Sequence, residues 1–131
     1  MAATTDNEMP RQSLAGGQLL VAISGAVVTL FRECTGKGPE HCKAHWAGDN
    51  TVLVLLGGGF TGAERTLFEA GHGEAVQAQR RILHGVLTER LTAAVEELAG
   101  RRVVAFMSAS HQEPDLTAEI FVLEPDLAHR A

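Results

Sequence analysis

The N-terminal part of the chain has the apolar spacing of an amphipathic helix. Between residues 12 and 34, apolar side chains recur at steps of three and four, which is the period of one helix face. These positions are Leu20, Ile23, Val27, Leu30, Phe31 and Cys34. Glycines and a proline at residues 36–39 are residues that commonly end a helix. We therefore predict a long N-terminal helix, preceded by a polar tail over residues 1–11.

Strand alternation replaces this helical spacing after the first helix. Residues 41–46 read His-Cys-Lys-Ala-His-Trp, which places the cysteine, alanine and tryptophan on one face of a strand and polar side chains on the other. Turn-forming residues 48–50 follow, and residues 51–56 form a nearly unbroken apolar run. The two segments predict a β-hairpin.

Two further helices are predicted in the middle of the chain. Thr61 and Glu64 have the T-x-x-E spacing of a capping box, in which each side chain accepts a backbone N–H of the first helical turn. We expect the glycines at residues 71–73 to break this helix. A long helical pattern then runs to Gly100, where a stop is expected. Its apolar positions are Val76, Leu83, Leu87, Leu91, Val95 and Leu98.

The last third of the chain predicts two more strands. Residues 103–108 are continuously apolar, and residues 118–123 are the expected partner across a polar loop at residues 109–116. The predicted order is α-β-β-α-α-β-β. This is an α+β fold, with a four-stranded, mainly antiparallel sheet packed by a long N-terminal helix and a long central helix. We expect a single domain over residues 12–127 and a short tail at residues 128–131.

Two of the predicted strands carry apolar residues on both faces. Residues 51–56 and 103–108 lack the alternation of an antiparallel sheet that has one solvated face. Both sheet faces are therefore expected to be covered, and a second copy of the chain is the simplest cover for the surface that the helices leave. We predict a homodimer.

Composition narrows the class of protein and of partner. A chain of 131 residues with 45% hydrophobic residues fits one soluble globular domain. A net charge of −5 and an aromatic content of 5% argue against nucleic acid as a partner. The apolar run at residues 19–31 is interrupted, and it is shorter than the roughly 17–25 residues of a membrane span, so we predict a core helix that does not span a membrane. The absence of a signal-peptide pattern predicts a cytoplasmic protein with Cys34 and Cys42 reduced.

Two glycine-rich segments resemble nucleotide-binding motifs only in part. Residues 57–62 match G-x-G-x-x-G, but a second parallel strand within about 30 residues and an acidic residue about 20 positions further on are both missing. Residues 35–39 lack the first glycine and the Ser or Thr of a P-loop. We interpret the first segment as a glycine-rich strand exit and the second as a helix end, and predict no cofactor.

A zinc site is not predicted either, although cysteine and histidine cluster near the first strand. Adjacent His41 and Cys42 point to opposite faces of a strand, and His41 and His45 are separated by about 13 Å. Zinc ligands lie about 2.0–2.3 Å from the metal, so this strand cannot supply three of them.

Acidic and histidine residues near the C-terminus are the one grouping suited to acid–base chemistry. His111 is followed by Glu113 and Asp115 in the predicted loop. Turn formation by Asp115 and a solvated His111 explain the same residues, and no nucleophile motif such as G-x-S-x-G occurs. A hydrolase or isomerase using His111 with Asp115 remains an alternative, and we favour a non-enzymatic protein.

Four polar residues are candidates for contact with a ligand or partner. They are Lys37, Arg81, His111 and Asp115, which would form an anion site if the loops at the sheet ends converge. Arg81 and its neighbour Arg80 are otherwise interpreted as a solvated or ion-paired helix face, because acidic residues share that helix.

The chain resembles the MpsC-like (YbcI-type) family of small bacterial domains. The segments that carry the resemblance are residues 33–39 (Glu-Cys-Thr-Gly-Lys-Gly-Pro), residues 60–67, residues 93–108 and residues 111–125. The resemblance implies an accessory or interaction protein, with a protein partner at the membrane, linked to a membrane-potential-generating or bicarbonate/ion transport system. It implies no catalytic residue set. A small-molecule or anion-binding regulatory domain is the alternative function.

Overall fold

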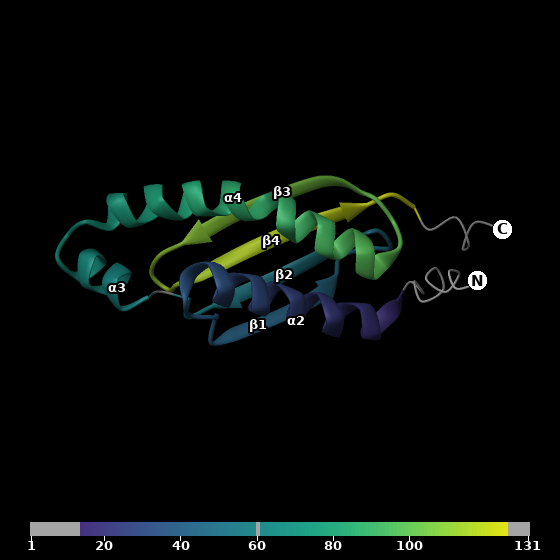
Figure 1. Cartoon of the computed structure of the whole chain (residues 1–131), viewed down its shortest axis with the longest axis horizontal. Coiled ribbons are helices and arrows are strands. Elements are labelled where there is room, and N and C mark those ends of the chain that lie inside the picture. Colours follow the sequence, from purple (N-terminus) through teal and green to yellow (C-terminus); the bar gives the residue numbers. More distant parts are fainter. Residues whose placement is uncertain (1–13, 60, 126–131) are drawn as a thin grey trace, which may run out of the picture.

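The computed structural model describes residues 14–59 and 61–125, and its helices and strands follow the predicted order (Figure 1). The predicted tails at residues 1–11 and 128–131 lie outside the described residues. The α+β fold class is confirmed. The elements are α2 (Gly16–Thr35), β1 (His41–Trp46), β2 (Thr51–Gly57), α3 (Gly62–Glu69), α4 (Gly73–Ala99), β3 (Val103–His111) and β4 (Leu116–Leu123).

The four strands form one antiparallel sheet in the order β1-β2-β4-β3. Two hairpins, β1–β2 and β3–β4, are joined where β4 pairs with β2. Figure 1 shows α2 lying along β1 and α4 along β3 and β4, with α3 at the end of the sheet where β2 exits. The long N-terminal and central helices therefore pack on the sheet as predicted.

The core lies between the two long helices and the sheet face beneath them. Alternate residues of β2 and β4 point toward the helices, and α2 and the C-terminal half of α4 contribute the facing apolar side chains. Among the most deeply buried are Leu19, Ile23, Val27, Val52, Val54, Leu87, Leu91, Val95, Phe121 and Leu123. The alternation predicted for β1 is confirmed, since Ala44 is buried while Lys43 and His45 are exposed.

The opposite side of the sheet, which we call the open face, is apolar at its centre. Leu53, Leu55, Met107, Ile120 and Val122 lie there in paired positions of β2, β3 and β4. Leu55 is 41% exposed and Met107 is 50% exposed. The apolar character of both faces, expected from the sequence, is therefore present, but α2 and α4 cover only one of them.

The last two strands are longer than predicted. The predicted loop at residues 109–116 is wrong, because the β3–β4 ladder continues to the pair formed by His111 and Leu116 and leaves residues 112–115 as the turn. Ser110 and Thr117, which face the helices here, lie 3.3 Å apart between hydroxyl oxygens. The strand was missed in this region because its buried face is polar.

The first helix ends as predicted and is the one candidate for a membrane span among the described residues. Gly36 has a φ of 82°, a left-handed conformation that favours glycine, and its N–H donates to the carbonyl of Arg32. By length and composition alone, the 20 residues of α2 could cross a membrane. In this fold one face of α2 packs into the core, while Val21 on the outer face is 74% exposed.

Candidate functional site

The long helix α4 packs on the sheet through two chemically different halves. Its C-terminal half is apolar and contributes to the core described above. In its N-terminal half, Gln77, Arg80 and His84 recur at steps of three and four, so they share one helix face. This face meets a row of polar side chains on the sheet, which we call the polar stripe. It consists of Ser108, Ser110, Thr117 and Glu119.

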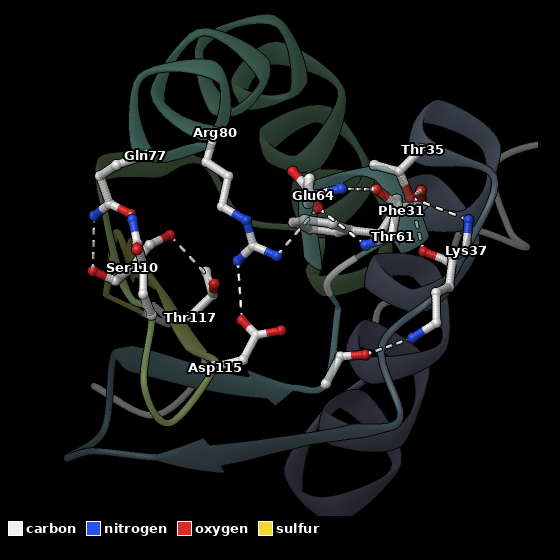
Figure 2. Close-up of polar contacts among 12 residues, drawn as sticks. Phe31, Thr35, Lys37, Thr61, Glu64, Gln77, Arg80, Ser110, Asp115 and Thr117 are labelled. Atoms are coloured by element: carbon white, nitrogen blue, oxygen red, sulfur yellow. Dashed lines mark hydrogen bonds and ion pairs between the residues drawn. The ribbon is translucent and has the colours of Figure 1, made fainter. Parts of the chain in front are cut away.

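Arg80 is a buried cation held between two carboxylates (Figure 2). Only 8% of the residue is exposed; its Nη1 donates to Asp115 Oδ1 at 3.0 Å, and its Nη2 lies 3.5 Å from Glu64 Oε1. Buried charges require such partners, because desolvation of an isolated ion is costly. Arg80 therefore ties α4 to the start of α3 and to the β3–β4 turn.

Glu64 is placed by the capping box that the sequence predicts at the start of α3. The N–H of Glu64 donates to Thr61 Oγ1 at 3.1 Å, and the N–H of Thr61 donates to Glu64 Oε1 at 3.0 Å. The same carboxylate oxygen thus serves the helix cap and the contact with Arg80. The capping box is confirmed, and it fixes one wall of the site.

A small cavity of about 30 Å³ lies beside Arg80. This volume suits one or two water molecules, since a single water needs at least about 10–15 Å³. Apolar and charged side chains share its lining, which includes Phe31, Lys37, Pro39, Leu56, Glu64, Arg80, Leu83, His84, Asp115 and Thr117. We call it the Arg80 pocket.

The glycine-rich exit from β2 forms the mouth of the Arg80 pocket. Lys37 donates from Nζ to the carbonyl of Gly58 at 2.8 Å, and this Nζ lies 3.7 Å from Glu40 Oε2. Gly58 has a φ of 73°, and a Cβ there would lie 2.6 Å from Glu40 Oε1. Position 58 therefore requires glycine for its backbone and for the close approach of Glu40, as expected of a strand exit that leads into a capped helix.

Glu119 is the most unusual residue of the polar stripe. It has 0% exposure, and neither carboxylate oxygen has a hydrogen-bond partner among the described residues. The nearest basic group is His84, whose Nε2 lies 3.7 Å from Glu119 Oε2. The other ring nitrogen of His84, Nδ1, lies 3.2 Å from the hydroxyl oxygen of Ser108, which is exposed. The three side chains form a path from the edge strand β3 into the core.

Burial shifts the protonation of both groups toward their neutral forms. Burial raises the pKa of Glu119 from 4.5 to about 7. The nearby Ser108 hydroxyl opposes this shift, although its geometry does not meet the criteria of a hydrogen bond to either carboxylate oxygen. Burial, with the nearby charge of Arg80, lowers the pKa of His84. Burial also raises the pKa of Cys42 on β1, with a hydrogen bond to Ser24 opposing and the charge of Glu119 adding to the shift.

The structure brings together two of the four candidate residues predicted from the sequence. Lys37 and Asp115 line the Arg80 pocket, where Asp115 binds Arg80. Arg81 is exposed on α4, and His111 is exposed at the end of β3. His111 Nδ1 lies 2.9 Å from the carbonyl of Pro114, beside a separate shallow hollow near the start of α4.

The cysteine and histidine residues near β1 are spread over different surroundings. His41 and His45 are exposed on the open face. Both cysteines are free thiols, with Cys34 Sγ 3.4 Å from Arg90 and Cys42 Sγ 3.8 Å from the carbonyl of Ser24. Within residues 14–59 and 61–125, no group of three His, Cys, Asp or Glu side chains is placed to hold a metal ion.

Sequence reasoning missed Glu119, His84 and Ser108 and interpreted Arg80 as part of a solvated or ion-paired face. Arg80 is ion-paired, but its partners Glu64 and Asp115 lie outside α4, and the side chain is buried instead of solvated. A signal was available, because Arg80 and His84 occupy the same helical period as the buried Val76 and Leu87. Charged residues at core positions indicate either a buried network or a functional group.

A family model described as "Na+-translocating membrane potential-generating system (MpsC)" matches residues 15–125, a span that includes every helix and strand described above. No curated protein and no solved structure matches the chain.

Proposed function

Because the chain belongs to the MpsC family, we propose that it is an accessory protein of a Na+-translocating, membrane-potential-generating system. It works on the cytoplasmic side, by binding proteins rather than by catalysis. The observation that carries the proposal is the open face, a sheet surface with an apolar centre that no described helix covers. Large apolar patches of this kind mark protein interaction sites.

The first partner of the open face is a second copy of the chain. The described residues of this face include no Asp or Glu, and the single lysine, Lys43, lies on the edge strand β1. The opposite edge, β3, presents Ala105, Met107 and Ala109. A two-fold axis that lays β1 of one protomer over β3 of the other therefore places each Lys43 against an uncharged edge.

The size of the open face is sufficient for a small homodimer interface. Four strands of six to nine residues, spaced about 4.8 Å apart with a rise of about 3.3 Å per residue, give a face of roughly 19 by 25 Å. Two such faces in contact bury on the order of 1,000 Å² once side-chain relief is included, which is the lower bound for a specific interface. The dimer is therefore expected to dissociate at low concentration.

The homodimer is tested by light scattering on the purified full chain at micromolar concentration. Wild type is expected at twice 13.9 kDa, and Leu55→Glu at the monomer mass, because it places a charge in the centre of the open face. Val21→Glu is the matched control, since it makes the same kind of change on the exposed face of α2 and should stay dimeric. A monomeric wild type, or a dimeric Leu55→Glu, would refute this part of the proposal.

The accessory role is tested by sodium transport. Inverted membrane vesicles from cells that lack the chain are expected to take up Na+ more slowly than vesicles from the parent strain. Adding purified wild type should restore the rate, and Leu55→Glu should restore less. Unchanged Na+ uptake in vesicles without the chain would contradict an accessory role.

A second candidate function is small-molecule binding at the mouth of the Arg80 pocket, since the cavity itself has room for only one or two water molecules. Lys37, Arg80, Glu64 and Asp115 bring both signs of charge to a partly apolar pocket, which suits a zwitterion better than a simple anion. Bicarbonate, phosphate and glycine, each added at millimolar concentration, test this by the amide shifts of residues 57–59. A shift in wild type that is lost in Lys37→Met supports the site, and no shift with any of the three probes argues against it.

A further inference from the structure

The buried carboxylate of Glu119 needs a proton or a cation to be stable where it lies. It sits on β4 between Val54 of β2 and Ser108 of β3, and it faces the helices. Both oxygens are inaccessible and lack hydrogen-bond partners among the described residues. An ionised carboxylate in such a place pays a desolvation cost that the nearby Ser108 hydroxyl offsets only in part.

The charged and titratable groups around Glu119 come from two of the neighbouring elements. Glu119 interacts electrostatically with Cys42 on β1 and lies 3.7 Å from His84 on α4. His84 in turn interacts with the charge of Arg80, also on α4. Arg80 is already held by Glu64 and Asp115. His84 is therefore the group that can exchange a proton with Glu119, because its Nε2 is 3.7 Å from the carboxylate and its Nδ1 contacts the exposed Ser108.

We propose that Glu119 and His84 form a site that binds one proton, fills and empties in the neutral pH range, and exchanges this proton with solvent through Ser108. In the loaded state Glu119 is a neutral carboxylic acid, and neutral His84 donates its Nδ1–H to the Ser108 oxygen. On release, the carboxyl proton moves to Nε2 of His84, and the Nδ1 proton leaves through the Ser108 hydroxyl to water. One proton is lost, and the Nε2–H tautomer of His84 then faces the carboxylate.

Proton release should also change the packing of α4. The released state has a buried negative charge under the polar half of the helix, while the apolar half is unaffected. Backbone amides in the N-terminal half of α4 are therefore expected to exchange hydrogen with solvent faster once Glu119 has released its proton. The exchange rates of amides near Leu91 and Val95 are expected to change less. This inference goes beyond the accessory role and does not depend on it.

NMR of the full chain labelled with ¹³C and ¹⁵N tests the site between pH 5 and pH 9. We expect one glutamate carboxyl carbon to titrate within about one unit of pH 7, and the His84 nitrogens to change tautomer at the same midpoint. The carboxyl signal should be absent in Glu119→Gln. In Ser108→Ala the midpoint should rise, because the hydroxyl lowers the pKa of Glu119. If Glu119→Gln does not fold, carbon–carbon correlations in wild type assign the signal.

Three results would overturn the proposal. The first is a Glu119 carboxyl that is already ionised at pH 5, and the second is a His84 that titrates to imidazolium over the range in which Glu119 ionises. The third comes from repeating the titration in sodium chloride and in choline chloride at equal ionic strength. Equal midpoints are expected, and a midpoint that falls in sodium would identify the ligand as a metal cation instead of a proton.

Discussion

Replacing Glu119 by glutamine should stabilise the protein at alkaline pH, although the residue is completely buried. The pKa of Glu119 is about 7 in the folded chain, against an ordinary value of 4.5. Between these values the folded protein binds more protons than the unfolded one, so the free energy of unfolding falls as pH rises. A difference of 2.5 pKa units corresponds to about 3 kcal/mol. Glutamine keeps the shape of the neutral acid and cannot ionise.

Urea denaturation of Glu119→Gln and wild type, at pH values from 4.5 to 8.5 and constant ionic strength, measures this effect. The free energy of unfolding of the variant minus that of wild type should increase by about 3 kcal/mol over this range and level off above pH 7. Taking the difference removes the contributions of other titrating groups. The exposed Glu89→Gln on α4 controls for the loss of a negative charge as such. A difference that is constant, or that falls as pH rises, would show that Glu119 is ionised and stabilised by His84.

Three other substitutions test the walls of the site through urea denaturation at pH 7, and a fourth, on α2, serves as a control. Arg80→Gln should cost about 3–5 kcal/mol, because it leaves the buried Glu64 and the partly buried Asp115 without their cation. A loss below about 1 kcal/mol would mean that the ion pairs are solvated. Thr61→Ala should cost about 1 kcal/mol by removing the α3 cap, and an unchanged stability would argue against the capping box. Gly58→Ala should cost more than about 1 kcal/mol, whereas Gly25→Ala in open space on α2 should gain about 0.5–1 kcal/mol; equal effects would contradict the strained backbone at Gly58.

The fold could be predicted because its signals are local. The spacing of apolar residues in α2 and α4, the alternation in β1 and the capping box at Thr61 each lie within one element, and the structure confirms them. The loop predicted at residues 109–116 was wrong for the opposite reason. Ser110 and Thr117 are strand residues whose polar side chains become acceptable only when they face each other and α4.

The site was less predictable because its contacts are distant in sequence. Arg80 meets Glu64 and Asp115 only after α3, α4 and the β3–β4 turn have packed together. From the sequence, an arginine on a helix with many acidic residues was reasonably interpreted as a solvated or ion-paired surface. Glu119 stands between apolar neighbours in a strand, and whether it faces the core depends on the register with β2, which the sequence does not specify.

The strand order β1-β2-β4-β3 has a consequence for how the chain folds. Each hairpin closes locally, but the seam between β2 and β4 joins positions such as Val54 and Glu119 that are about 65 residues apart. Loop-closure entropy makes such a non-local pairing slow, so docking of the two hairpins is expected to limit the folding rate. Because that seam encloses Glu119, docking should be coupled to proton uptake when the pH is near or below 7, and folding should slow as the solution becomes alkaline.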